Sequence, residues 1–106
     1  MKKIAVIEDD ELLNQALVIT LEKEGYQVTA GKSCREGIAL LQDGPDLMLV
    51  DINLPDGNGI AVCREAERFG KMPVLFLTAR DEEHDMLEAF EAGCDDYVVN
   101  PFQMNV

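Results

Sequence analysis

Positive charge is scarce in this sequence of 106 residues, which has nine lysines and arginines against twenty-one aspartates and glutamates, for a formal net charge of −12. A surface of this charge repels phosphate groups and anionic lipid heads, so we expect no direct binding of nucleic acid or of a membrane by this chain. No apolar run approaches the roughly 18 residues of a transmembrane helix, and the apolar stretch near the start is too short for a signal peptide. We therefore predict one soluble, cytoplasmic domain.

Cysteine and histidine are also few. The sequence contains only Cys34, Cys63, Cys94 and His84, and no two cysteines have CxxC spacing. An odd number of cysteines argues against a disulfide framework, and a single histidine argues against a zinc site. We expect buried free thiols in a reducing compartment. The hydrophobic content of 47% excludes a disordered acidic tail.

Four short apolar runs, none of which alternates cleanly with polar residues, predict strands that are buried on both faces of a parallel sheet. They are residues 4–7, 47–50, 74–77 and 97–99, and the partly polar residues 26–30 fit an edge strand. Apolar residues recur at helical spacing between the runs, over 13–21, 38–41, 62–69 and 87–90. Alternating strands and helices predict right-handed βαβ units and a doubly wound α/β fold.

Polar residues follow the predicted strands at the points where the strands end. Glu8 and Asp9 follow the first run, Asp51 the second, Thr78 the third and Asn100 the last. Ligands of open parallel sheets bind beyond the carboxyl ends of the strands, so these side chains should share one rim. Carboxylates this close repel one another unless a cation lies among them, and oxygen ligands without His or Cys favour Mg²⁺.

A simpler interpretation applies to each acid taken alone. Acids after a strand often cap the next helix, and Asp10 is predicted to be such an N-cap, with Glu11 in the first turn. Three acids at two strand ends favour the metal site. Asp51 is the hardest to explain otherwise, because it ends the most apolar strand and precedes a turn-rich loop at 53–59.

Several motifs together resemble the receiver domain of two-component response regulators, in the same order and at compatible spacings over nearly the whole chain. The motifs are the acidic pair Glu8-Asp9, Asp51, the loop 54–59, Thr78-Ala79 and the closing segment 92–102. Within the closing segment, Asp95-Asp96-Tyr97 resembles the OmpR/PhoB-like subfamily. The resemblance implies a signalling switch, at most a weak autophosphatase, and not a turnover enzyme.

The resemblance also implies an architecture: a flavodoxin-like, five-stranded parallel sheet in the order 2-1-3-4-5. Residues 1–106 would form one receiver domain, truncated before its usual fifth helix and without the winged-helix DNA-binding domain that usually follows. Without that helix an apolar face of the sheet would be open. We therefore expect a homodimer or a segment-exchanged oligomer.

The resemblance also implies roles for the site residues. Asp51 would accept a phosphoryl group from a sensor histidine kinase. Mg²⁺ would be held by Asp9, Asp51 and the main-chain carbonyl of Asn53, and Glu8 would reach it through water. The resemblance further implies that the Thr78 hydroxyl bonds the phosphoryl group and that Tyr97 rotates inward; read alone, Tyr97 fits a half-buried strand aromatic equally well.

Asn100 stands where the family normally has lysine, either as a natural departure or as a variant. Asparagine is neutral, so it removes a charge-assisted contact of about 1.5–3 kcal/mol to the phosphoryl group. One alternative is therefore an atypical or pseudo-receiver that acts through protein contacts with weakened phosphorylation. A hydrolase or cofactor binder is the least favoured reading, since residues 8–11 are all acidic where such proteins have a phosphate-binding loop.

Overall fold

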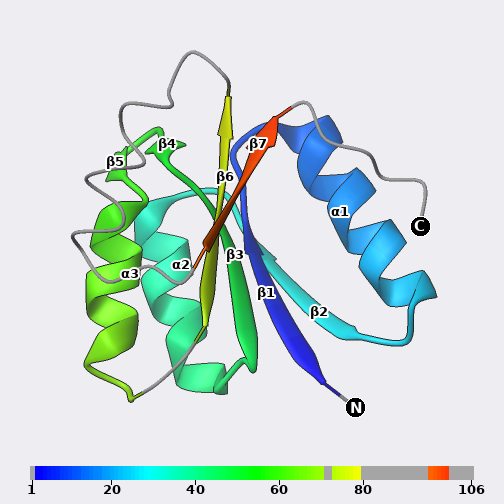
Figure 1. Cartoon of the computed structure of the whole chain (residues 1–106), viewed down its shortest axis with the longest axis horizontal. Coiled ribbons are helices and arrows are strands. Elements are labelled where there is room, and N and C mark those ends of the chain that lie inside the picture. The colour runs from blue at the N-terminus through cyan, green and yellow to red at the C-terminus, as the bar shows by residue number, and fades with distance from the viewer. Residues whose placement is uncertain (1, 71–72, 80–95, 101–106) are drawn as a thin grey trace.

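A five-stranded parallel sheet forms the centre of the computed structural model, which describes residues 2–70, 73–79 and 96–100 (Figure 1). The strands lie in the order β2-β1-β3-β6-β7, and every neighbouring pair is parallel. Their bounds are β1 Lys3–Ile7, β2 Gln27–Gly31, β3 Leu47–Asp51, β6 Val74–Ala79 and β7 Asp96–Asn100. Both the α/β class and the predicted order 2-1-3-4-5 are confirmed.

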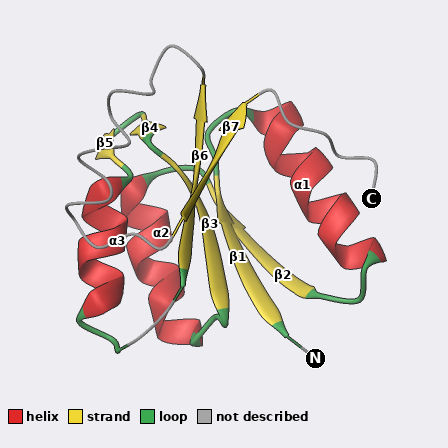
Figure 2. Cartoon of the chain, in the orientation of Figure 1, coloured by secondary structure: helices red, strands yellow, loops and turns green. Residues whose placement is uncertain are grey.

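Helices cover both faces of this sheet (Figure 2). Helix α1 (Glu11–Lys23) lies on one face, and α2 (Cys34–Leu40) and α3 (Ile60–Glu67) lie on the other. A 3₁₀ turn, η1 (Leu41–Asp43), continues α2. The predicted helix around 87–90 and the segment after residue 100, where the fifth helix would begin, lie outside the described residues. No helix in the described part of the chain is both long enough and apolar enough to cross a membrane.

The apolar strands supply two cores because successive strand residues point to opposite faces. On the α1 face, Ile4 and Val6 pack in one cluster with Leu17. On the other face, Ala5 and Ile7 belong to a larger cluster that includes residues of α2 and α3. The predicted burial of β1 on both faces is confirmed, since residues 4–7 are all buried.

The ends of α1 follow its sequence signals. Asp10 is the N-cap, and its carboxylate accepts the N–H of Leu13 at 3.1 Å. At the other end Gly25 has φ +93°, and the N–H of Tyr26 bonds back to the Leu21 carbonyl at 3.2 Å. This is the pattern of a Schellman cap, which favours glycine because its backbone is left-handed.

The structure adds one local detail to the expectations and corrects another. The loop after Asp51 contains a short hairpin, β4 (Asn53–Leu54) paired antiparallel with β5 (Gly57–Asn58). Helix α3 ends at Glu67, so Phe69 lies beyond it and is 55% exposed instead of completing the apolar stripe. The chain turns away there, because the N–H of Gly70 bonds the Glu67 carbonyl and Gly70 has φ +107°.

Candidate functional site

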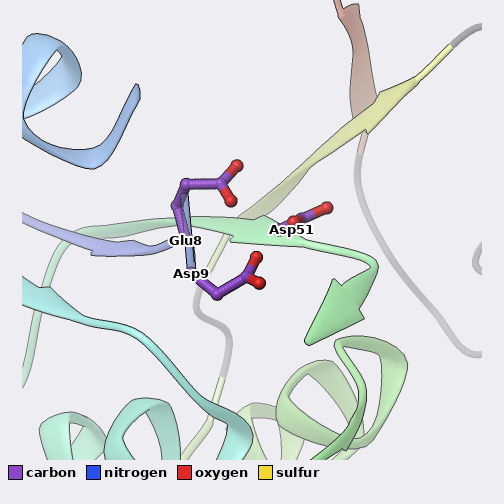
Figure 3. Close-up of side chains that lie close together, drawn as sticks. All are labelled: Glu8, Asp9 and Asp51. Atoms are coloured by element: carbon purple, nitrogen blue, oxygen red, sulfur yellow. The ribbon is translucent and has the colours of Figure 1, made fainter. Parts of the chain in front are cut away.

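Three carboxylates meet at the carboxyl edge of the sheet (Figure 3). Because Ile7 of β1 is in register with Val50 of β3, the acids that follow these residues are brought to adjacent strand ends. Glu8 and Asp9 come from the end of β1 and Asp51 from the end of β3. One oxygen from each carboxylate lies within 4.8 Å of the others. The structure thus brings together the acids that the sequence placed on one rim.

Glu8 is the buried member of this acidic cluster, with a residue exposure of only 3%. Its carboxylate accepts the N–H of Asp10 at 2.9 Å. Burial raises the pKa of Glu8 to about 8; the hydrogen bond from Asp10 opposes this, and the negative charge of Asp51 adds to it. Without a cation, Glu8 therefore holds a proton at neutral pH.

The donor chemistry of the cluster fits a hard divalent cation. All three side chains offer carboxylate oxygens, which Mg²⁺ prefers to nitrogen or sulfur. Asp9 is exposed and Asp51 half-buried, so an ion with several waters can be accommodated at the surface. A cation at this place would also offset the negative charge of Asp51 and would thereby lower the pKa of Glu8.

Asn14 holds the backbone at this edge, a role that the sequence analysis missed. Its buried side-chain amide donates to the carbonyl of Glu8 at 2.9 Å and to that of Gly31 at 3.1 Å. The N–H of Glu8 donates to the same Gly31 carbonyl at 3.0 Å. One amide of α1 thus joins the ends of β1 and β2. The available signal was a polar residue three positions before Leu17 on the buried stripe of α1.

The main chain around Asp51 is held on both sides. The N–H of Asn53 donates to an Asp51 carboxylate oxygen at 3.3 Å, and that of Ile52 donates to the Leu77 carbonyl at 3.3 Å. Gly59 packs so closely that an added Cβ would overlap the carbonyl oxygen of Asp51. Only glycine fits there without a shift of the backbone that carries Asp51.

The remaining predicted residues are described by their backbones alone. Strand β6 extends to Ala79, so Thr78 lies inside the strand and not beyond it. Asp51 is paired with Leu77, which places the Thr78 backbone at the same end of the sheet. In β7, Tyr97 pairs with Phe76 and Asn100 with Ala79. Asn100 therefore shares this edge, while the side chains of all three residues lie outside the description.

The two cysteines that the structure describes are not part of the acidic cluster. Cys34 and Cys63 are buried free thiols, as predicted, whereas Cys94 and His84 lie outside the described residues. Burial raises the pKa of the Cys34 thiol, and the charge of Asp56 adds to this. A thiol of raised pKa is a poor nucleophile at neutral pH, which agrees with a packing role.

Comparisons with known proteins place these features in context. A family model described as "Response regulator receiver domain" matches residues 4–106. The transcriptional regulatory protein AfsQ1 of Streptomyces coelicolor is 38% identical over 107 residues, which cover 100% of this chain and 48% of AfsQ1. The chain thus spans about half the length of this curated relative.

Solved structures match the fold closely. A two-component response regulator from Clostridium difficile has a TM-score of 0.91 at 28% identity, covering 98% of this chain and 87% of that one. The non-phosphorylated HemR receiver domain of Leptospira biflexa has a TM-score of 0.88 at 33% identity, covering 98% and 86%.

Proposed function

Since the chain belongs to the response regulator receiver domain family, of OmpR/PhoB-like type, we propose that Asp51 accepts a phosphoryl group from a sensor histidine kinase. The observation that carries the proposal is the meeting of Glu8, Asp9 and Asp51 within 4.8 Å at one edge of the sheet. Receiver domains are signalling domains, and this edge is where an open parallel sheet offers a site.

In the proposed reaction, an Asp51 carboxylate oxygen attacks the phosphorus of a phosphohistidine. A new O–P bond forms, the P–N bond breaks, and its electron pair returns to the imidazole nitrogen, which takes up a proton. Asp51 is half-buried, so part of the residue is accessible to a partner on the solvent side.

Mg²⁺ would be held by Asp9, Asp51 and the main-chain carbonyl of Asn53, with Glu8 acting through water. When bound, it supplies positive charge that neutralises the carboxylates and the phosphoryl oxygens. The proposed role of Glu8 requires it to lose the proton that burial favours. Burial, and to a smaller extent the charge of Asp51, raise the pKa of Glu8, and a cation bound at the cluster would favour its ionised form.

The proposed switch uses residues of β6 and β7. The Thr78 hydroxyl would bond the phosphoryl group and Tyr97 would move behind it, so that added charge changes the surface near the last strand. In the whole protein, which we propose acts in the cytoplasm, this change would control a DNA-binding domain outside this chain. AfsQ1, about half of which this chain matches, is a transcriptional regulatory protein, and this supports that output.

Phosphorylation by acetyl phosphate tests the proposal. We expect Mg²⁺-dependent labelling of the wild-type chain, read by phosphate-affinity electrophoresis, and none in Asp51→Asn. Asp46→Asn is the matched control, because Asp46 is an exposed carboxylate whose bond to the Lys3 N–H lies away from the cluster. Labelling of Asp51→Asn at the wild-type level would disprove the assignment.

Asn100 is tested in the same assay. Asn100→Lys restores a charge-assisted contact of about 1.5–3 kcal/mol, so labelling or its readout should increase about tenfold or more. Equal labelling and equal activation of the two proteins would show that Asn100 does not weaken the site.

The pseudo-receiver alternative has no support among the described residues. A titration with beryllofluoride and Mg²⁺, followed by NMR, separates the two functions. A receiver should show saturable shifts around Asp51, and a pseudo-receiver should show none.

A further inference from the structure

The carboxylate of Asp56 binds the first turn of a helix that is distant in sequence. It accepts the main-chain N–H of Cys34 at 2.7 Å and that of Arg35 at 3.0 Å, one with each oxygen. These N–H groups open α2 and have no partner within their own helix, so Asp56 satisfies two of them. The same two bonds hold the pKa of Asp56 below its usual value.

Asp56 lies in the connection of the β4–β5 hairpin, residues 53–58, which begins two residues after Asp51. A third hydrogen bond joins the hairpin to α2, since the Cys34 thiol donates to the carbonyl of Asn58 at 3.4 Å. Leu54 attaches the hairpin to the core, because its side chain is buried in the larger core cluster. The hairpin is thus attached to α2 and to the core.

The opposite end of the hairpin reaches the acidic cluster. Asn53 pairs with Asn58, and the Asn53 N–H donates to Asp51 at 3.3 Å. Asn53 thus connects the hairpin to Asp51, so a shift of the hairpin relative to α2 would move the Asn53 backbone as well. The proposed metal ligand in this segment is a main-chain carbonyl, which has no side-chain torsions with which to compensate.

We propose that Asp56 is a positioning residue for the magnesium site: by tying the hairpin to α2, it sets the place of the Asn53 carbonyl. The inference rests on the proposed function, because it takes that carbonyl to be a ligand. A carboxylate that only capped α2 would change the stability of the helix and leave the affinity for Mg²⁺ unchanged. The two roles therefore separate in a binding experiment.

Magnesium titration followed by ¹⁵N NMR of this chain provides the test, and the probe is Mg²⁺ alone. In the wild type, the amide signals of Cys34 and Arg35 should shift with the same midpoint as that of Asn53. In Asp56→Ala, the Asn53 signal should still titrate at about tenfold higher Mg²⁺, as is typical when an outer partner of a ligand is lost. The amide signals of Cys34 and Arg35 should no longer shift during the Mg²⁺ titration.

Two further variants help to interpret the result. Asp56→Asn keeps one acceptor oxygen without the charge, so its Mg²⁺ affinity should lie between those of the wild type and Asp56→Ala. If Asp56→Ala folds poorly, Asp56→Asn still tests the role, because its Mg²⁺ affinity should be lower than that of the wild type. Asp46→Ala removes another exposed carboxylate that accepts a main-chain N–H, from Lys3 at 2.8 Å, and should bind Mg²⁺ as the wild type does.

Affinity within twofold of wild type in both Asp56 variants, with the Cys34 and Arg35 signals showing that the bonds are lost, would overturn the positioning role alone. An equal loss in Asp46→Ala would also overturn it, because the effect would then come from stability in general. Absence of Mg²⁺ binding by the wild-type chain would overturn the metal site and the positioning role together.

Discussion

Glu8 illustrates how one residue can work against stability while serving a site. Its ordinary pKa of 4.5 is raised to about 8 in the folded chain, mainly by burial. Between these two values, the folded form binds a proton that the unfolded form has released. The contribution of Glu8 to the free energy of unfolding therefore falls as the pH rises through this interval.

The corresponding measurement is urea unfolding of the metal-free chain in EDTA between pH 5 and pH 8. Glu8 alone should contribute a slope of up to about −1.4 kcal/mol per pH unit. Glu8→Gln removes the titrating group, so the difference between wild type and variant should change with pH. Parallel pH profiles for the two proteins would contradict the raised pKa.

Asn14 has the opposite effect at the residue scale, because its buried amide satisfies backbone carbonyls at the end of β1 and β2. Asn14→Leu should lower the free energy of unfolding by about 1–3 kcal/mol, since the Glu8 carbonyl loses its buried donor. Gln15→Leu, at the adjacent exposed position, should change it by less than about 0.5 kcal/mol. Equal effects in the two variants would argue against this role.

At the scale of elements, the termination of α1 depends on the left-handed backbone of Gly25. Gly25→Ala should destabilise the chain by about 1–2 kcal/mol, because a Cβ is strained at φ +93°. Gly25→Asn should cost less, since asparagine tolerates this conformation better than alanine does. Chemical denaturation of the three proteins measures the order, and a reversed order would mean that the cap is not the limiting feature.

The β4–β5 hairpin shows why very short elements are hard to predict from the sequence. Its sequence was correctly interpreted as turn-rich, yet each strand has only two residues, too few for a periodic pattern. The bonds from Asp56 to α2 join residues 21 and 22 positions apart, and nothing local in either segment indicates them.

At the scale of the whole molecule, part of the net charge of −12 comes from the acidic cluster of Glu8, Asp9 and Asp51. Mg²⁺ that binds only the folded chain should stabilise it by about 2.7 kcal/mol at 100 times its dissociation constant. Thermal unfolding with Mg²⁺, compared with KCl of equal ionic strength, measures this gain. Asp51→Asn should be more stable than wild type without metal and should lose most of the Mg²⁺ effect. An equal rise in both proteins would place the ion elsewhere.

The sequence by itself determined the α/β class, the strand order implied by the family and the residues that follow each strand. These features depend on local periodicity and on motifs, because buried parallel strands and helix caps require particular residues at particular spacings. The side-chain roles proposed for Thr78, Tyr97 and Asn100 remain predictions from the sequence.

Only the tertiary structure decided how these parts act on one another. Three features depend on how the strands and α1 are placed relative to one another: the approach of the acids to within 4.8 Å, the burial that raises the pKa of Glu8 and the bonds of the Asn14 amide. Burial and electrostatic coupling are properties of the assembled surroundings of a group, and segments distant along the chain supply those surroundings only after folding.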